Sequence, residues 1–479
     1  MTLNIERREL HGKRLIGYAS GNFGLSLVNI FTGTFIFQFY VYTINLSSIL
    51  VSVGLIINSI LIAIFAIISG VIVDNKKPSK RGKRKIFLIL GLPIWFSANI
   101  FLWLPPWYCP PSNSFFLPTA LYFWFMISIK AVFGTLIFTT YLSMLPEQSQ
   151  TSENRKKVAS IRVIFSITAS VLALLMPLTI QSLLEDPENA KWWQSSGNII
   201  VTLMPIIGIS FALFGSVTII FTYLSVDESF HNQYELQNEK KKVKDAFRAI
   251  FYPLTDRNYN KLLLVQFFAR TTGKVLAILI IPLITYVLLF KDNDFYIYII
   301  VSITSKLTWY IFWRQFFKNK TLITKYAVCL LLAGIGTILV IIFIIPIGNF
   351  LLIVILFFIT EGTILGALYA FPLFSIPLGA NLVHDAAKNI DSESLDRALS
   401  SLSGSYYGAL NFISSMGQTV GSLIVGFILI GPNEKNPTII VLLYSSIGIL
   451  YFISIIFLKK IRIYEEQIKV EIDMSQTIN

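Results

Sequence analysis

The segment VDESFHNQYELQNEKKKVKDAFRAIFYPLTDRNYN, residues 226–260, decides how the chain is organised, because it is the longest polar stretch between two sets of apolar runs. Its basic run at 240–244 is typical of a solvated linker. The residues that follow, 245–252, form an amphipathic pattern that we predict to lie along a membrane surface. The segment divides the chain into two parts of similar size.

Apolar runs bounded by charged or turn-forming residues fill both parts. They lie near residues 15–43, 47–73, 86–104, 115–145, 159–184, 197–225, 261–290, 296–317, 326–346, 350–378, 402–430 and 438–458. Each run has the length of a transmembrane helix, which needs about 20 mostly apolar residues. We predict an all-α membrane protein with twelve transmembrane helices in two six-helix bundles, residues 1–225 and 261–458, with a linker at 226–260 and a tail at 459–479.

The composition excludes other classes of protein. Hydrophobic residues make up 54% of the 479 residues and charged residues only 14%, whereas about 25% of the residues in soluble domains are charged. The chain is therefore neither a soluble enzyme, a disordered protein nor a collagen-like fibre. Cys109 and Cys329 are too few and too far apart for a disulfide framework.

The net charge of +13 is concentrated in alternate connections between the runs. Of the 39 Lys and Arg residues, only Lys191, Lys291 and Lys435 lie in the connections on the opposite side. Cytoplasmic loops carry such an excess, so we predict a cell-membrane protein with both termini, the linker and the tail in the cytoplasm. This distribution explains the positive charge without a nucleic-acid partner, and it makes the lipid bilayer the expected partner.

Motifs of catalysis and cofactor binding are absent from the sequence. It contains neither a GxxxxGK[ST] phosphate loop nor an HExxH or GxSxG motif, and no paired His and Cys cluster indicates a metal. We therefore expect no enzyme activity, no cofactor, no metal site and no use of ATP by this chain.

The connection between the second and third runs carries a candidate gate motif. Gly70 and Asp74 end the second run, and Arg81, Gly82 and Lys83 begin a basic cluster that continues to residue 85. A Gly on a helix face permits close helix approach, the carboxylate accepts hydrogen bonds from a neighbouring helix end, and the basic cluster meets anionic headgroups. The arrangement resembles the loop signature of the major facilitator superfamily. An ordinary cytoplasmic loop is the alternative interpretation.

Further blocks narrow this resemblance. They are GYASGNFG at 17–24, YLSMLPE at 141–147, NRKK at 154–157, SIR at 160–162, GSYYGALNF at 404–412 and GQ at 417–418. In order and spacing these blocks resemble the glycoside–pentoside–hexuronide cation symporters, the family of the melibiose permease. The resemblance covers most of the chain. It implies two pseudo-symmetric bundles that rock about a central sugar site and a co-transported sodium ion or proton.

Most functional residues of that family have no counterpart here. The cation-binding carboxylates of the second span would fall at Ile62 and Ala66, and the shared carboxylate of the fourth span near Phe138. The sugar-binding carboxylate of the first span would fall at Ser26, and the lysine of the eleventh span near Ser415. Only the arginine of the fifth span has a clear counterpart, Arg162. The resemblance therefore implies that the family's sodium site is lost.

Ionisable residues within the runs are functional candidates, because a charge at bilayer depth costs a few kcal/mol. Glu361 either pairs with Lys274 or Lys306 or carries a proton during transport. Lys130 either reaches toward the interface and backbone carbonyls or points into a cavity and attracts an anion. Arg162 is either a gate residue or a solute contact.

Aromatic and amide side chains complete the candidate site. Tyr18, Tyr141, Tyr407 and Trp124 are candidates for stacking on a sugar ring, and amides in apolar runs either join helices or bind polyol hydroxyls. The residues that we predict to bind solute are Asn22, Ser26, Lys130, Tyr141, Arg162, Lys274, Tyr407, Asn411 and Gln418.

The predicted function is secondary or facilitated transport of a sugar, glycoside or sugar acid by alternating access, as a uniporter or with a proton rather than sodium. The intramembrane Lys and Arg residues favour an anionic solute. Two alternatives remain open at this point: a carrier of lysolipids, which a related animal family moves with the same fold, and a membrane sensor or scaffold that transports nothing.

Overall fold

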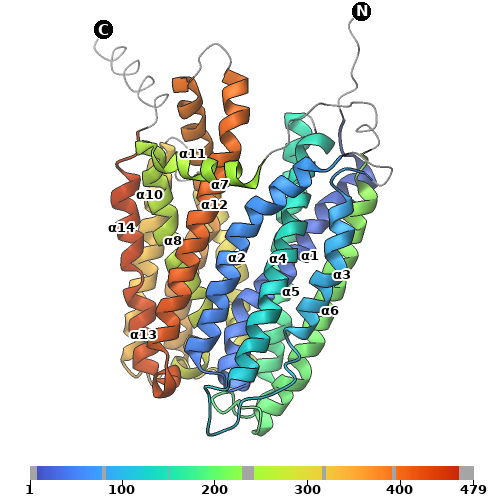
Figure 1. The fold of residues 1–479 in the computed structure, drawn as a ribbon. Helices are drawn as coiled ribbons and strands as arrows, with labels where there is room; N and C mark the ends of the chain where they lie inside the picture. The colour runs from blue at the N-terminus through green and yellow to red at the C-terminus, as the bar shows by residue number, and fades with distance from the viewer. Residues whose placement is uncertain are drawn as a thin grey trace, which may run out of the picture.

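The computed structural model describes residues 8–77, 82–149, 151–228, 242–315, 320–390 and 395–462, and these contain helices and no strand (Figure 1). The first part of the chain forms α1 (Gly12–Gln38), continued by the π-helical η1 (Phe39–Thr43), and then α2 (Ser48–Asn75), α3 (Ile86–Phe101), α4 (Leu117–Gln148), α5 (Ser152–Ser182) and α6 (Ser195–Ser225).

The second part begins with the short α7 (Val243–Phe251). It continues with α8 (Arg257–Pro282) and η4 (Leu283–Val287), α9 (Phe295–Gln315), α10 (Leu322–Leu339), α11 (Phe350–Ile390), α12 (Leu395–Ile428), η7 (Gly431–Lys435), α13 (Pro437–Ser446) and α14 (Ile449–Leu458). Eleven helices of the described residues are long and apolar enough to cross a membrane, when α13 and α14 are taken together as one span.

These helices agree with the predicted runs except in length. The third run forms α3, which has only 16 residues, about 24 Å at 1.5 Å per residue, and is shorter than the hydrocarbon core. The tenth run was expected to end at 378, but α11 continues to Ile390. His384 and Asp385, which follow the predicted end of this run, therefore lie in the last turns of the helix. The first two residues of the predicted basic run, 240 and 241, and the part of the tail beyond residue 462 lie outside the described residues.

Side-chain caps fix where several helices begin. The hydroxyl of Thr151 accepts a hydrogen bond from the Asn154 backbone N–H at the start of α5. The Asp256 carboxylate accepts from the backbone N–H groups of Asn258 and Tyr259 at the start of α8. Such caps satisfy N–H groups that have no partner within the helix. Residues of the polar segment thus start the first long helix of the second part.

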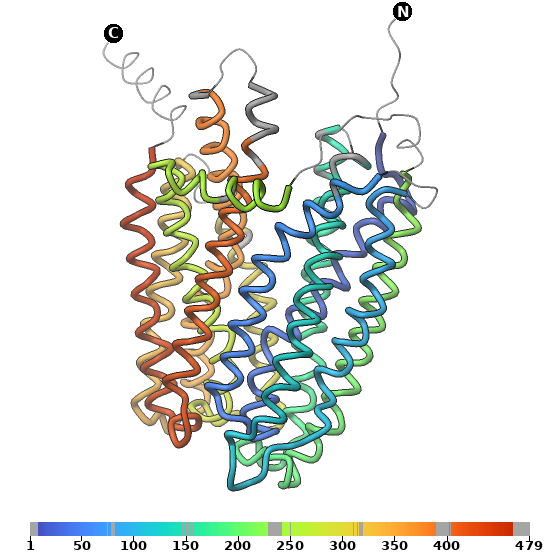
Figure 2. Tube along the Cα trace, viewed as in Figure 1, coloured from blue at the N-terminus to red at the C-terminus, as the bar shows by residue number. Residues whose placement is uncertain are grey.

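The long helices gather in two groups that lie side by side (Figures 1 and 2). In the first group α1 packs on α5 and α6, and α4 packs on α2 and α3; in the second group α8 packs on α12 and α14, and α11 on α9 and α10. The groups, here called the N half (α1–α6) and the C half (α8–α14), meet where α2 contacts α12, α1 contacts α8, and α5 contacts α9. These six helices therefore form the boundary between the halves.

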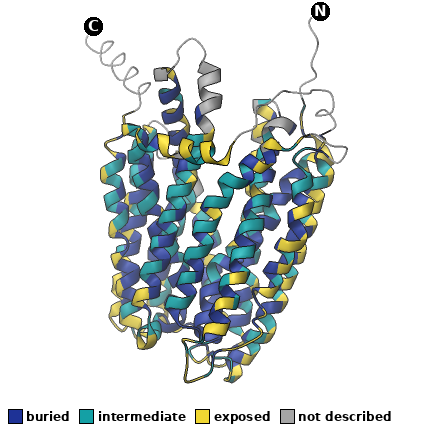
Figure 3. Cartoon of the chain, viewed as in Figure 1, coloured by how far each residue is buried: buried dark blue, intermediate teal, exposed yellow. Residues whose placement is uncertain are grey.

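Buried residues line the interior of each half, and exposed residues gather on the outer faces (Figure 3). Large apolar side chains make up much of this outer surface, for example Phe125 and Ile164, with 61% and 62% of their surface exposed. In a protein that crosses a bilayer, lipid covers such side chains.

The helix α1 begins and the helix α14 ends at the same end of the molecule, here called the termini end (Figure 1). The opposite end, called the loop end, carries the connections around residues 43–47, 183–194 and 429–436. At the termini end α7 lies across the helix axes and contacts both α2 and α12. This placement agrees with the expectation of a surface-lying segment at 245–252.

Candidate functional site

Three helices of the N half bring a polar cluster together inside the bundle. The Tyr18 ring on α1 stacks on the Tyr141 ring of α4 with centroids 4.9 Å apart, and its hydroxyl donates to the Tyr141 carbonyl over 2.7 Å. The Arg162 guanidinium on α5 lies 5.0 Å from the centroid of the Tyr141 ring. The Asn22 amide on α1 donates to the Arg162 carbonyl over 3.1 Å and accepts from Arg162 Nη2 over 3.4 Å. Three of the predicted solute residues thus lie in one cluster.

Two polar atoms of this cluster lack a partner within the described part of the protein. They are the Tyr141 hydroxyl and the Arg162 Nε, and both are fully enclosed. Buried polar groups are hydrogen-bonded in the great majority of cases, and an unsatisfied one costs about 1–3 kcal/mol. The cluster therefore retains hydrogen-bonding capacity for a further group.

A row of hydroxyl groups extends the cluster along α1 and α5. Ser26 Oγ lies 3.5 Å from Ser166 Oγ, and Ser170 accepts a hydrogen bond from Lys306 Nζ of the C half over 3.3 Å. The sequence interpretation included Ser26 but missed Ser166 and Ser170. The sequence did contain a signal for them. Arg162, Ser166 and Ser170 follow one another at intervals of four residues, which places all three on one face of α5.

The intramembrane lysines lie in two different environments. Lys130 on α4 is 8% exposed, and its amino group has no partner among the residues that the structure describes. Reaching toward the interface, one of the expectations for Lys130, does not match this burial. Lys274 on α8 is half-buried, and it is close enough to Lys130 for the two charges to interact.

Glu361 on α11 lies away from these lysines. Its carboxylate accepts a hydrogen bond from the Tyr444 hydroxyl of α13 over 2.7 Å, and the side chain is 3% exposed. The expected ion pair with Lys274 or Lys306 is not formed in the described structure, where Lys306 donates instead to Ser170. Glu361 needs no lysine partner here, because Tyr444 of the same half lies within hydrogen-bond distance and supplies an uncharged donor.

The predicted residues of α12 form a separate face. Tyr407 and Gln418 are half-buried and Asn411 is exposed. Their spacing places them on one side of the helix. No side-chain hydrogen bond or ring contact joins these three described residues to the cluster around Arg162, so the candidate residues divide between the N and C halves.

The positions of the lost cation site carry apolar side chains in the structure. Ile62 on α2 and Phe138 on α4 have 38% and 42% of their surface exposed, and Ala66 is half-buried. No group of three or more His, Cys, Asp or Glu residues is placed to hold a metal ion among the described residues. Since sodium and other hard cations need several oxygen ligands, the side chains present here do not fit such an ion.

Comparison with known proteins identifies the family. The family described as MFS/sugar transport protein matches residues 17–458, nearly the whole chain. The chain belongs to this family. It is therefore a multi-pass membrane transport protein of the major facilitator superfamily and not an enzyme. No curated protein matches the sequence.

Solved structures share the fold at low sequence identity. The D-xylose–proton symporter is 13% identical, with 94% of this chain and 97% of that chain covered and a TM-score of 0.62. The nucleoside transporter NupG is 11% identical, with 94% and 100% covered and a TM-score of 0.62. The inward open xylose transporter XylE from E. coli is 13% identical, with 94% and 95% covered and a TM-score of 0.59. At these identities the likeness shows the fold alone.

The loop motif of this transporter is organised around an acid that the sequence interpretation missed. Glu228 is 2% exposed, and its carboxylate accepts hydrogen bonds from the successive backbone N–H groups of Lys83, Arg84 and Lys85 over 2.6–3.3 Å. These groups lie just before α3, where helix geometry favours an anion. Gly82 has φ +94°, and a Cβ there would meet the Glu228 carboxylate. Arg81 and the side chain of Asp74 lie outside the description, and Gly70 is on α2 with open space around it.

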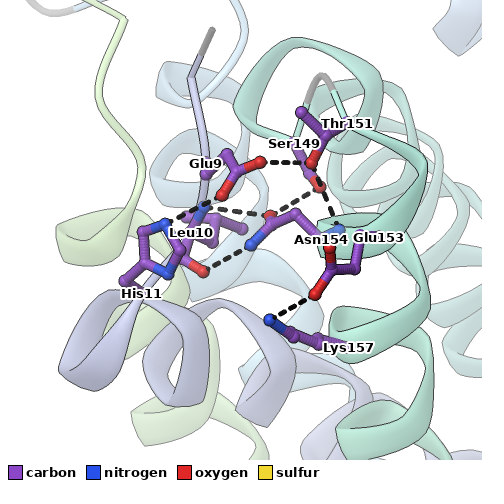
Figure 4. A network of polar contacts seen from close by, with 8 residues as sticks. All are labelled: Glu9, Leu10, His11, Ser149, Thr151, Glu153, Asn154 and Lys157. Atoms are coloured by element: carbon purple, nitrogen blue, oxygen red, sulfur yellow. Dashed lines mark hydrogen bonds and ion pairs between the residues drawn. The ribbon is translucent and has the colours of Figure 1, made fainter.

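A second polar network, at the termini end, holds the segment that precedes α1 (Figure 4). The Asn154 side chain accepts from the Leu10 N–H over 3.0 Å and donates to the Leu10 carbonyl over 2.8 Å. Glu9 pairs with His11 over 3.0 Å and accepts a hydrogen bond from Thr151. The segment before α1 is thereby attached to the start of α5.

The two halves are joined at the loop end. Tyr42 donates to the Glu434 carbonyl over 2.7 Å, and Ser48 donates to the Gly426 carbonyl over 3.3 Å. Lys435 donates to the Glu188 carbonyl over 2.6 Å. Among the described residues, the remaining side-chain hydrogen bonds between the halves connect Lys435 with Asn189, Tyr296 with Ser182 and Thr179, and Lys306 with Ser170. None of these bonds lies at the termini end.

The pH is expected to control this loop-end contact through Glu434. Burial raises the pKa of Glu434 to about 7, against the opposing effect of Lys191 and Lys435. An exposed glutamate titrates near pH 4.3. Glu434 therefore binds its proton more tightly when the loop-end contact is made than when the contact is broken. The contact is thus stabilised as the pH falls from about 7.5 to about 5.5. Burial lowers the pKa of Lys191 to about 8, so this lysine stays largely protonated over that range and leaves the sign unchanged.

Hydrogen–deuterium exchange of residues 426–436 measures this effect. We expect exchange to slow at pH 5.5 after correction for the intrinsic rate, and Glu434→Gln to make it slow at both pH values. Corrected exchange that does not depend on pH in the wild type contradicts the assignment to Glu434.

Proposed function

We propose that this chain carries a sugar-type, polyhydroxylated solute across the cell membrane by alternating access, and that the solute binds to the cluster of Asn22, Tyr141 and Arg162 and to the row that Ser26 begins. The observation that carries the proposal is the pair of enclosed polar atoms without a partner, Tyr141 Oη and Arg162 Nε. A solute hydroxyl accepts from the guanidinium and exchanges a hydrogen bond with the phenol, so a polyol satisfies both atoms.

The role of Tyr141 in this proposal differs from the stacking that the sequence suggested. Its ring already contacts Tyr18 and the guanidinium of Arg162. What it offers to a solute is therefore its hydroxyl group. Tyr407, Asn411 and Gln418, on the opposite half, are proposed to contact the solute from α12 when the halves close around it.

The loop-end contacts support a form that is closed at that end. We propose that the N half (residues 1–225) and the C half (261–458) rock about the solute, joined by the linker at 226–260. The excess of Lys and Arg in alternate connections supports a cytoplasmic position for the termini end. Opening the loop end requires that the bonds of Tyr42, Ser48 and Lys435 break.

Coupling to sodium is not part of the proposal, because Ile62, Ala66 and Phe138 supply no oxygen ligand. Glu361 is the proposed site for a coupled proton, since it is buried and its hydrogen bond to Tyr444 holds it within the C half. Measuring proton movement during solute uptake distinguishes the two mechanisms. Protons enter with the solute if transport is proton-coupled, and they do not if the protein is a uniporter.

A thermal-stability screen of the purified protein tests the proposed function. Neutral sugars, sugar acids, nucleosides and lysolipids are added separately, each in sodium and in potassium. A ligand that binds only the folded protein at about 100 times its Kd adds about 2.7 kcal/mol of stability. We expect a sugar class to raise the melting temperature equally in both salts, and Tyr141→Phe to reduce its affinity about tenfold, as for one lost hydrogen bond. A response that needs sodium, or a response to lysolipids alone, contradicts the proposal.

A further inference from the structure

A cavity of about 530 Å³ opens at the loop end, and residues of both halves line it. Glu188 and Asn189 belong to the connection between α5 and α6 of the N half, whereas Tyr286 and Lys435 belong to the C half. Pockets for small ligands have volumes of about 300–1,000 Å³, so this cavity has the size of a binding site. Because both halves line it, the cavity is complete only while the loop end is closed.

Apolar side chains form one wall of the cavity, where a span leaves the membrane. The helix η6 (Val340–Ile344) ends the span that α10 begins, and Ile344 and Ile345 line the cavity from there. Ile345 and Leu289, which also lines the cavity, have 65% and 52% of their surface exposed. Lipid covers such side chains in a membrane, so this wall fits the acyl chain of a lipid better than it fits a sugar.

The polar residues of the cavity are one cation, one acid, an amide and a phenol. Lys435 Nζ donates to the Glu188 carbonyl over 2.6 Å and to Asn189 Oδ1 over 3.4 Å, and it lies 5.7 Å from the centroid of the Tyr286 ring. An ammonium group has three donors, so one donor remains. The Glu188 carboxylate makes no hydrogen bond or ion pair with the residues that the structure describes. The cavity therefore offers one donor and one acidic acceptor to a ligand.

We propose that this cavity binds a phospholipid of the surrounding membrane whose zwitterionic headgroup ends in a primary ammonium group. The phosphate accepts a hydrogen bond from the remaining donor of Lys435, and the ammonium group donates to the Glu188 carboxylate. One acyl chain lies on the apolar wall that Ile345 and Leu289 form. Hydrogen bonds between charged groups are shorter and stronger than those between neutral groups.

The charges of the cavity favour this headgroup over two others. The quaternary ammonium group of a choline headgroup has no hydrogen to donate to Glu188, and a glycerol headgroup has no cation to pair with it. Since the bound lipid contacts residues of both halves, it stabilises the form that is closed at the loop end. The inference goes beyond the proposed function, because it assigns a site at which a membrane lipid regulates the opening of the loop end.

The test compares three lipids that share their acyl chains: dioleoylphosphatidylethanolamine, dioleoylphosphatidylcholine and dioleoylphosphatidylglycerol. Each is titrated into the purified full chain in detergent. Glu188→Gln removes the acid but leaves the backbone carbonyl that holds Lys435. Glu185→Gln is the matched control, because Glu185 is an exposed acid of the same connection that does not line the cavity. Melting temperatures without added lipid check that both variants fold.

We expect the wild type to bind the ethanolamine lipid about tenfold more tightly than the other two, as for one additional hydrogen bond to a charged group. Glu188→Gln should bring the ethanolamine lipid within threefold of the choline lipid, whereas Glu185→Gln should keep the wild-type preference. Ile345→Asn should weaken the ethanolamine and choline lipids by the same factor, because it changes the wall that contacts the chain. The ethanolamine lipid should also slow hydrogen–deuterium exchange of residues 345–353 and 429–436 in the wild type but not in Glu188→Gln.

Other results overturn the lipid site. Equal binding of the three lipids would mean that they only coat the apolar surface. A preference for the ethanolamine lipid that persists in Glu188→Gln, or slowed exchange only outside these two segments, would place the site elsewhere. Tightest binding of the glycerol lipid would show that the cavity selects an anion. None of these measurements uses a sugar, so the lipid site and the proposed function can fail independently.

Discussion

Replacing Arg162 with Ala is expected to lower solute transport about 100-fold. The guanidinium lies 5.0 Å from the ring centroid of Tyr141 and bonds to Asn22, and its Nε is free for a solute. Hydrogen bonds to a charged group contribute about 1.5–3 kcal/mol each, and about 2.8 kcal/mol corresponds to a factor of 100. Uptake into proteoliposomes at sub-saturating solute measures the loss.

Arg162→Lys is the matched variant for this prediction. It keeps the positive charge but replaces the planar fork of donors by a single ammonium group, so we expect transport between that of the wild type and that of Arg162→Ala. The melting temperature of each variant without ligand checks that the bundle is intact. Transport by Arg162→Ala within threefold of the wild type would remove Arg162 from the solute site.

Replacing Gly426 with Val is expected to stop turnover. Gly426 lies on α12 where it meets α2 at the loop end, and a Cβ there would lie 2.4 Å from the Cβ and Oγ of Ser52. The closed loop end cannot form with a larger side chain at this position, whereas a form open at that end remains possible. The expected result is transport at background, with faster hydrogen–deuterium exchange in residues 42–52 and 426–436.

Gly404→Val provides the control on the same helix. A Cβ at Gly404 would meet nothing within 4 Å, and the change in helix propensity is the same as at Gly426. We expect it to keep most of the wild-type activity. If the two variants lose activity to the same extent, the effect belongs to the helix and not to the loop-end contact.

The sequence predicts the fold well because lipid imposes a simple rule on composition. A spanning helix must be apolar over a fixed length, so the twelve runs, the even number of spans and the polar segment at 226–260 are all visible without a structure. The exceptions are lengths. The early end of α3 at Phe101 and the extension of α11 to Ile390 were not visible in the hydropathy of the sequence.

The candidate site was predictable only in part. Asn22, Tyr141 and Arg162 were found because polar residues are rare in apolar runs, and the structure brings them together. The predicted ion pair of Glu361 with a lysine was wrong, because matching charges favours a lysine, whereas the packing supplies Tyr444. Glu228 was missed because it looks like any acid of a polar linker. Its burial depends on a backbone turn at Gly82 that lies far from it in the sequence.

Solute counterflow in sodium-free proteoliposomes that contain the purified full chain is the most direct test of transport by alternating access. The vesicles are loaded with unlabelled sugar or sugar acid, and entry of the labelled compound is followed in wild type, Arg162→Ala and Gly426→Val. The account predicts saturable counterflow by the wild type in potassium buffer, about 100-fold lower entry with Arg162→Ala, and none with Gly426→Val. Counterflow that requires sodium, or that persists in Gly426→Val, would contradict it.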